Sequence, residues 1–175
     1  MGLLRQSRSV LEAVVKECNE TTNVSILENF NIVYLDTVET DHAVRVQSRV
    51  GARLPAYCTA AGKIQLAYLT DKELARSITG RELKRFTATT ITDREMLASH
   101  LSRVAEQGFA VDNEELDTGV RCISSPIRDY TRRIIGAVSI SGPTMRFTDD
   151  RIENEFIPLI RKAEEQISAK FGYQR

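Results

Sequence analysis

The order of hydrophobic patterns along the chain is the feature that most constrains its fold. Apolar residues recur with helical spacing near both ends, over residues 3–19 and 149–171, and short β-branched runs lie between them. These runs predict strands at 24–28, 32–39, 43–47, 109–111, 120–128 and 133–141. The last two strands are joined by a short hairpin connection, 129–132, which requires antiparallel pairing. The sequence therefore predicts an α+β domain, in which helices pack on an antiparallel sheet of about six strands.

Capping residues place the helices between the two groups of strands. After a predicted loop at 49–55, a helix is expected at 60–69 with Thr59 as its N-cap. Two sites have the spacing of a capping box, in which a hydroxyl side chain lies three residues before a Glu. They are Thr70 with Glu73 and Thr92 with Glu95. A helix at 93–107 should end at Gly108, because Gly adopts the left-handed conformation at low cost.

Charge balance and cysteine number exclude several kinds of protein. The 175 residues include 24 basic and 24 acidic ones, and no dense Lys/Arg cluster of the kind that binds nucleic acid occurs. The three cysteines are far apart in the sequence and cannot all pair with one another, which favours a reducing compartment. No apolar run is long enough for a signal peptide or a membrane span. We expect one soluble, cytoplasmic domain that binds no membrane and by itself binds DNA poorly.

The start of the helix at 60–69, together with two serines far along the chain, is the best candidate for a binding site. Small residues follow Thr59, so the first backbone N–H groups of the helix would be open to an anion. The helix dipole would add about 0.3–1 kcal/mol at a surface. Ser139 and Ser141 lie two apart on a predicted strand, so both hydroxyls point to one face. If that face meets the helix start, these donors surround a carboxylate-sized space; otherwise the serines are simply solvated.

Cys122 and the acidic run at 112–115 also have plain structural interpretations. A cysteine in an apolar strand is usually a small buried hydrophobe, and carboxylates in a loop are usually solvated. His42 and His100 stand alone, far from the cysteines in sequence, so no metal site is predicted. No motif pairs Cys122 with a base, and no GxSxG, HExxH, P-loop or GxGxxG pattern occurs. The residues predict neither a catalytic site nor a bound cofactor.

Four motifs, taken in this order, resemble the effector domain of IclR-type transcriptional regulators. They are Leu54-Pro55 with Thr59-Ala60-Ala61-Gly62-Lys63, Gly108-Phe109-Ala110-Val111-Asp112-Asn113-Glu114-Glu115, Gly119-Val120-Arg121-Cys122-Ile123 and Ser139-Ile140-Ser141-Gly142-Pro143. The resemblance covers nearly the whole chain. It implies an inter-domain linker helix at 1–20 and a GAF- or profilin-like domain at 21–175 for effector binding and oligomerisation. It also implies six effector contacts: Ala60, Ala61, Asp112, Cys122, Ser139 and Ser141.

The same resemblance implies a cytoplasmic bacterial transcription factor. Its winged helix-turn-helix would precede the linker helix and is expected to be missing from this sequence, so operator DNA would be bound only through that missing domain. The expected effector is a small carboxylate, a 2-oxo or hydroxy acid, with aromatic acids as further candidates, and the expected assembly is a homodimer or tetramer. Relatives often have Gly where this chain has Ala60, whose methyl group would narrow the pocket. Asp112 would select the ligand by accepting a hydrogen bond from it.

Two functions from other classes stay open at the level of the sequence. One is a small enzyme that acts on an oxoacid, with Cys122 as nucleophile and Asp112 as base, although no activating group for the thiol is apparent. The other is a dimerisation module without a ligand, for which the amphipathic helix at 3–19 would suffice.

Overall fold

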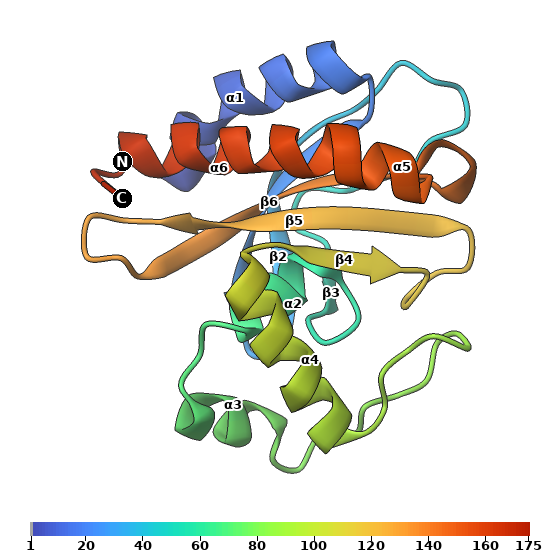
Figure 1. Ribbon diagram of the computed structural model, residues 1–175, viewed down its shortest axis with the longest axis vertical. Coiled ribbons are helices and arrows are strands. Elements are labelled where there is room, and N and C mark those ends of the chain that lie inside the picture. Colours follow the sequence, from blue (N-terminus) through green and yellow to red (C-terminus); the bar gives the residue numbers. More distant parts are fainter. Residues whose placement is uncertain (1) are drawn as a thin grey trace.

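The computed structural model describes residues 2–175, and Figure 1 shows one sheet between two layers of helices. Within these residues the sheet has six antiparallel strands in the order β3-β2-β1-β6-β5-β4. The strands are β1 (Thr21–Glu28), β2 (Asn31–Val38), β3 (Arg53–Pro55), β4 (Ala110–Asn113), β5 (Val120–Arg128) and β6 (Ile134–Pro143). The helices are α1 (Leu3–Cys18), α2 (Ala60–Leu66), α3 (Asp71–Ile78), α4 (Arg94–Gln107), η1 (Thr144–Arg146), α5 (Asp149–Arg151), η2 (Ile152–Phe156) and α6 (Ile157–Lys170). The predicted α+β class and six-stranded antiparallel sheet are confirmed.

Different helices cover the two faces of the sheet. In Figure 1, α1 and α6 lie above the sheet, whereas α2, α3 and α4 lie below it. Each face has its own apolar cluster, one built with residues of α1 and α6 and the other with residues of α2 and α4. Alternation along β6 separates the faces, because Val138 and Ile140 join the α1 and α6 cluster while Ser139 and Ser141 point toward α2.

The prediction of a strand at 43–47 is wrong. These residues form a loop, and Val44 is 58% exposed. The third strand is instead β3, which falls in the segment predicted as a loop and pairs with β2. β-branched residues favour a strand only where they can pack on a half-buried surface, and no strand of the described residues pairs with 43–47.

β1 begins at Thr21, earlier than the predicted residue 24. It includes Thr22 and Asn23, polar residues that lie between the helix predicted at 3–19 and the strand predicted at 24–28. All three are 0% exposed, because β1 is a central strand between β2 and β6. Because these residues are polar, the sequence pattern did not predict that the buried strand begins here.

One of the two predicted capping boxes forms. Thr70 accepts a hydrogen bond from the Glu73 N–H, and the Glu73 carboxylate accepts one from the Thr70 N–H. The second box is wrong, because Asp93 is the N-cap of α4 and accepts from the Met96 N–H at 2.8 Å. An Asp is at least as good an N-cap as a Thr, so Asp93 takes the position from Thr92.

The last helical segment changes its hydrogen-bond pattern along its length. The single helix predicted at 149–171 contains a π-helical turn at Ile152–Phe156, between α5 and α6. Pro158 follows this turn and lacks the N–H that would bond to the carbonyl one turn earlier. A widened turn accommodates the proline ring and the missing bond without breaking the helix.

Candidate functional site

A cavity of about 130 Å³ lies between the start of α2 and the sheet. All six residues predicted to contact an effector line it: Ala60, Ala61, Asp112, Cys122, Ser139 and Ser141. The structure thus brings together side chains from α2, β4, β5 and β6. The interpretation of Ser139 and Ser141 as solvated residues is wrong, since they are 3% and 2% exposed. Contact of these six residues with a ligand stays a prediction.

Strand register explains why residues so far apart in sequence meet. Asp112 of β4 pairs with Cys122 of β5, and Cys122 pairs with Ser141 of β6. Directly paired residues of antiparallel strands point to the same face, with their Cβ atoms about 4.5–5.5 Å apart. The three side chains therefore form one row across the sheet. Ser139 belongs to the next row, where its hydroxyl donates to Ser124 at 3.0 Å.

The start of α2 faces this row. Thr59 is the N-cap as predicted, and its hydroxyl accepts from the Gly62 N–H at 3.2 Å. Within the described part of the chain, no hydrogen bond reaches the N–H groups of Ala60 or Ala61, which line the cavity. Two donors are thus available to a ligand. Since α2 has only 7 residues, the local N–H groups matter more here than the dipole of a long helix.

Asp112 is the main acidic group of the cavity. It is 3% exposed, and its Oδ1 accepts from the Glu115 N–H at 2.7 Å. Burial raises the pKa of Asp112 from 3.8 to about 7, against the lowering effect of that hydrogen bond. The alternative interpretation of the acidic run as solvated is wrong for Asp112 and for Glu115, which is 5% exposed. Near neutral pH, Asp112 is therefore present in both protonated and ionised forms.

Asp112 should make the protein less stable as the pH rises from about 4 to about 7. Because folding raises the pKa of Asp112 to about 7, the folded state holds this proton more tightly than the unfolded state within that window. The stabilisation is complete below the unfolded pKa and is lost as the pH rises through the folded pKa. The free energy of unfolding of the wild type, minus that of Asp112→Asn, should be roughly 3–4 kcal/mol larger at pH 4 than at pH 8. Urea denaturation of both proteins at pH 4 and pH 8 measures this difference. The same difference at both pH values would contradict the raised pKa of Asp112.

Cys122 has the properties of a packed thiol and not of a nucleophile. Burial raises the pKa of Cys122, and the neighbouring Asp112 carboxylate raises it further. A reactive cysteine requires the opposite, a positive environment that favours the thiolate. The side chain therefore offers a polarisable wall to the cavity.

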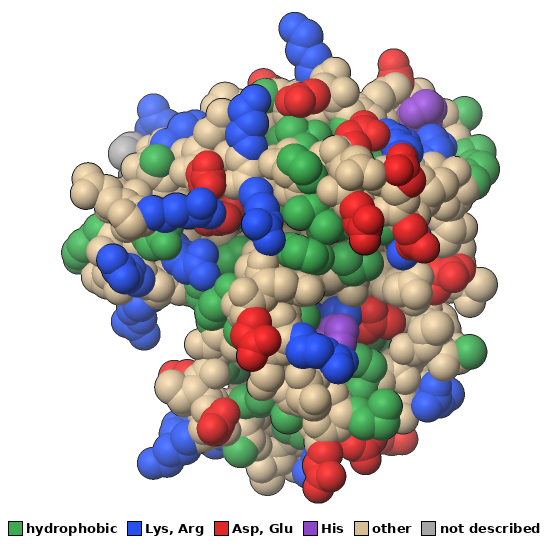
Figure 2. Space-filling view, viewed as in Figure 1, with side chains coloured by type: hydrophobic (Ala, Val, Ile, Leu, Met, Phe, Trp, Pro, Cys, Tyr) green, Lys and Arg blue, Asp and Glu red, His purple; other side chains and the backbone are tan. Residues whose placement is uncertain are grey.

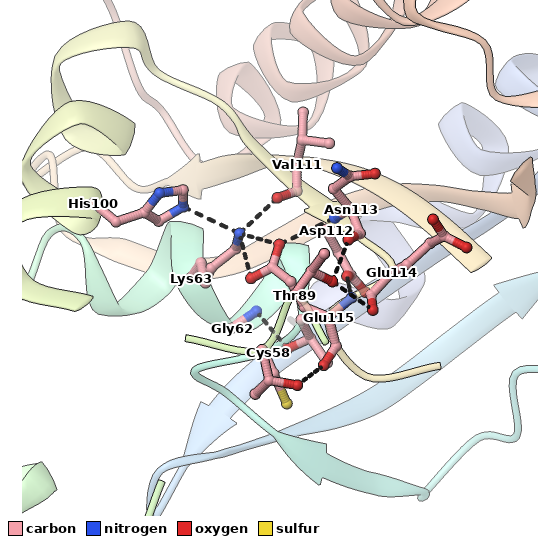
Figure 3. A network of polar contacts seen from close by, with 12 residues as sticks. Cys58, Gly62, Lys63, Thr89, His100, Val111, Asp112, Asn113, Glu114 and Glu115 are labelled. Atoms are coloured by element: carbon pink, nitrogen blue, oxygen red, sulfur yellow. Dashed lines mark hydrogen bonds and ion pairs between the residues drawn. The ribbon is translucent and has the colours of Figure 1, made fainter. Parts of the chain in front are cut away.

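Lys63 is a functional candidate that the sequence interpretation missed. It is 0% exposed, and Figure 3 shows its ammonium group at the centre of a network that joins α2 to β4 and the following loop. Its Nζ donates to Glu115 Oε2 at 2.7 Å and Oε1 at 2.9 Å, and to the Val111 carbonyl at 2.6 Å. The buried pair holds the end of β4, which contains Asp112, and the loop after it against α2. Its only sequence signal was a Lys in an otherwise small and apolar helix start.

His100 completes the network from α4. Its Nε2 lies 3.1 Å from Lys63 Nζ, which makes it an acceptor for the ammonium group. Burial lowers the pKa of His100 from 6.5 to about 4, and the positive charge of Lys63 lowers it further. His100 is therefore neutral at physiological pH and acts as a structural acceptor.

Four further polar residues line the cavity and were not predicted: Tyr34 of β2, Gln47 and Ser48 of the loop before β3, and Asp117. None of the described residues with a basic side chain lines it. No group of three or more His, Cys, Asp or Glu side chains within residues 2–175 could hold a metal ion. On the face drawn in Figure 2, basic and acidic side chains are interspersed. No helix in the described part of the chain is long and apolar enough to cross a membrane.

A sheet between two helical layers, with a small cavity at the start of a short helix, defines the class of three-layer α+β domains. The chain belongs to the IclR family, since the family model described as "Bacterial transcriptional regulator IclR C-terminal" matches residues 1–169. The resemblance inferred from the four motifs is confirmed. Characterised relatives are transcriptional regulators and not enzymes, which agrees with the predicted lack of a catalytic site.

Similar proteins support the same assignment along the whole chain. The HTH-type transcriptional regulator KdgR of Escherichia coli is 37% identical over 173 residues, which cover 99% of this chain and 65% of KdgR. The regulator XynR of the same organism is 34% identical, with coverage of 99% and 68%. The crystal structure of the E. coli KdgR C-terminal domain matches with a TM-score of 0.89 and 35% identity, over 99% of this chain and 100% of that one. The Thermotoga maritima IclR structure matches with a TM-score of 0.92 and 35% identity, over 99% and 70%.

Proposed function

We propose that this chain is the effector-binding domain of a bacterial transcriptional regulator and that a small organic acid binds in the cavity beside α2. One observation carries the proposal: the six predicted contact residues, separated in sequence, surround a single cavity of about 130 Å³. The ligand's carboxylate would accept from the free N–H groups of Ala60 and Ala61, and its other oxygens would meet Ser139, Ser141 and Asp112.

The size of the cavity favours a short acid. An engineered cavity of about 150 Å³ accommodates benzene, so the volume of about 130 Å³ suits a 2-oxo or hydroxy acid of a few carbons. A neighbour with the same fold, a double mutant of the PobR inducer-binding domain from Acinetobacter, was solved as a complex with 3-hydroxybenzoic acid. That structure has a TM-score of 0.90 and 24% identity over 96% of this chain and 98% of that one. An aromatic acid would require the walls of the present cavity to move.

The raised pKa of Asp112 explains how a cavity with an acidic side chain can bind an acidic ligand. An ionised carboxylate would repel an anion, but the pKa of about 7 leaves much of Asp112 protonated near neutral pH. The protonated group donates a hydrogen bond to the ligand, and the ionised group accepts one from a ligand hydroxyl. Binding of a simple 2-oxo acid should therefore weaken above pH 7, whereas a hydroxy acid should lose less affinity.

In the full-length regulator, the segment 1–20 that contains α1 would link this domain, 21–175, to an upstream winged helix-turn-helix. This chain spans 65% of the length of KdgR, and the remaining length leaves room for such a domain. The effector would bind two arrangements of the regulator with different affinities, and coupling of about 1–3 kcal/mol is the usual scale. We place the regulator in the cytoplasm as a homodimer or tetramer whose domain at 21–175 forms the assembly.

A thermal-shift screen tests the proposal with two- to six-carbon oxo and hydroxy acids and with 3-hydroxybenzoate. A ligand at about one hundred times its Kd adds roughly 2.7 kcal/mol, which raises the Tm of a domain of this size by about 5–10 °C. The shift should disappear in Ser141→Ala, which lacks a cavity hydroxyl. It should persist in Ser125→Ala, which removes a buried serine of β5 that does not line the cavity. No shift with any acid would favour a dimerisation module instead.

A further inference from the structure

The first half of β1 buries an unusual set of polar side chains. β1 lies in the middle of the sheet, and four of its polar residues are each 0% exposed: Thr21, Thr22, Asn23 and Ser25. Burial of a polar group costs about 1–3 kcal/mol in proteins unless it is hydrogen-bonded. Apolar residues in a central strand would avoid this free-energy cost, so the presence of polar residues here requires an explanation.

Asn23 connects the two strands that flank β1. Its Nδ2 lies 3.5 Å from Oγ of Ser141, the cavity residue of β6. Its Oδ1 accepts from the Thr37 hydroxyl of β2 at 2.9 Å. The carboxamide is suited to this position because it can donate and accept at the same time. The bond to Thr37 has ordinary length, whereas the contact with Ser141 is long and therefore easily changed.

A register shift in β2 extends this connection to the other face of the sheet. Residues two apart on a regular strand share a face, but the pairing of β1 with β2 shifts between Tyr34 and Asp36. As a result Tyr34 lines the cavity, whereas the Asp36 carboxylate accepts from Arg8 of α1 at 2.9 Å. The same Asp36 oxygen accepts from the Thr37 N–H at 2.9 Å, and Arg8 also donates to the Thr37 carbonyl at 3.2 Å. Hydrogen bonds thus run from the cavity through the sheet to α1.

We propose that Asn23 is a positioning residue through which Ser141 influences how α1 lies on the sheet. Ser141 Oγ accepts from Asn23, and its own hydroxyl hydrogen would be donated to a ligand in the cavity, in place of the neighbouring Cys122 thiol. A ligand oxygen that accepts this hydrogen makes Ser141 a better acceptor, which shortens the 3.5 Å contact. Thr37 and Arg8 transmit the change to α1. The inference rests on the proposed function for the ligand, since it states how an occupied cavity would affect the helix that leads to the DNA-binding domain.

Native-state hydrogen exchange of the α1 amides at 10–14 tests the coupling without any ligand. Ser141→Ala and Thr37→Val each remove one link with little change in volume. Each should speed exchange in α1, relative to the α4 amides, by about five-fold, which corresponds to the loss of one hydrogen bond. The double variant should show no further increase, because both changes break the same connection. The control Ser139→Ala removes a cavity hydroxyl that bonds Ser124 and should leave α1 exchange unchanged.

Two results would overturn the coupling. Additive effects in the double variant, or equal acceleration in α1 and α4, would mean that Asn23 merely stabilises the sheet. The second result is an effect of Ser141→Ala on α1 exchange that is additive with Thr37→Val but not with Thr40→Val. The coupling would then run through the loop before β3, since Thr40 of this loop donates to the Asn19 carbonyl at the end of α1 at 2.8 Å.

The same exchange measurement with pyruvate and 3-hydroxybenzoate as probes separates this inference from the proposed function. Binding of either probe without a change in α1 exchange overturns the coupling and leaves acid sensing intact. Coupling in the variants, with no acid bound in the thermal-shift screen, supports the role of Asn23 and contradicts acid sensing.

Discussion

Replacement of Lys63 by Met should lower the free energy of unfolding by about 3–5 kcal/mol. The methionine side chain fills similar space, but it leaves the Glu115 carboxylate buried and without its cation. Glu115 is 5% exposed and pairs with Lys63 at 2.7 Å, so water cannot replace the lost partner. Urea denaturation at pH 7 measures the change. NMR titration should also show the pKa of His100 rising from about 4, since the Lys63 charge is one of the causes that lower it.

Two variants show whether the effect arises from burial. Arg53→Met breaks an ion pair with Glu28 of similar length, 2.8 Å, whose side chains are 52% and 45% exposed. An exposed pair contributes about 0–1 kcal/mol, so this variant should be nearly as stable as the wild type. The double variant Lys63→Met/Glu115→Gln removes both charges and should recover at least half of the loss. Equal costs for Lys63→Met and Arg53→Met would show that the buried pair has no special role.

Replacement of Gly62 by Ala should destabilise the domain by about 3 kcal/mol or more, the upper end for overpacking. A Cβ at Gly62 would overlap the carbonyl oxygen, Cα and carbonyl carbon of Ala56. These are backbone atoms, so α2 would have to move away from the loop before it. Since Ala60 and Ala61 begin the same helix, ligand binding should be lost together with stability.

Gly2→Ala is the control for Gly62→Ala. Nothing lies within 4 Å of a Cβ built at Gly2, so the variant should change the free energy of unfolding by less than about 0.5 kcal/mol. Circular dichroism with urea gives both values, and isothermal titration with the acid found in the screen gives the affinity. A stable Gly62→Ala protein that still binds the acid would show that α2 does not need its close contact with Ala56.

Local patterns in the sequence predicted most of the architecture. Helical spacing located α1 and α6, Gly108 marked the end of α4, and the hairpin at 129–132 paired β5 with β6. Alternation along β6 predicted that Ser139 and Ser141 share a face. The family motifs supplied the six site residues, since neither Asp112 nor Cys122 has a local feature that separates a cavity residue from a solvated or packed one.

The errors have a common physical origin. Residues 43–47 have the composition of a strand but no neighbouring strand, whereas β3 has little strand pattern and pairs with β2. Thr22 and Asn23 are polar yet lie at the centre of the sheet. In each case the outcome depends on what packs against the segment, which is a property of distant parts of the chain.

The sequence by itself determined most of the elements and their order, the N-cap at Thr59 and the resemblance to the family, because helix periods, caps and motifs depend on neighbouring residues. Only the tertiary structure decided that Asp112 is buried with a pKa near 7, that Lys63 is enclosed with Glu115, and that a register shift in β2 turns Asp36 toward α1. Burial, charge pairing and strand register arise from contacts between residues far apart in the chain. The chemistry of the cavity, and its connection to α1, therefore exist only in the folded protein.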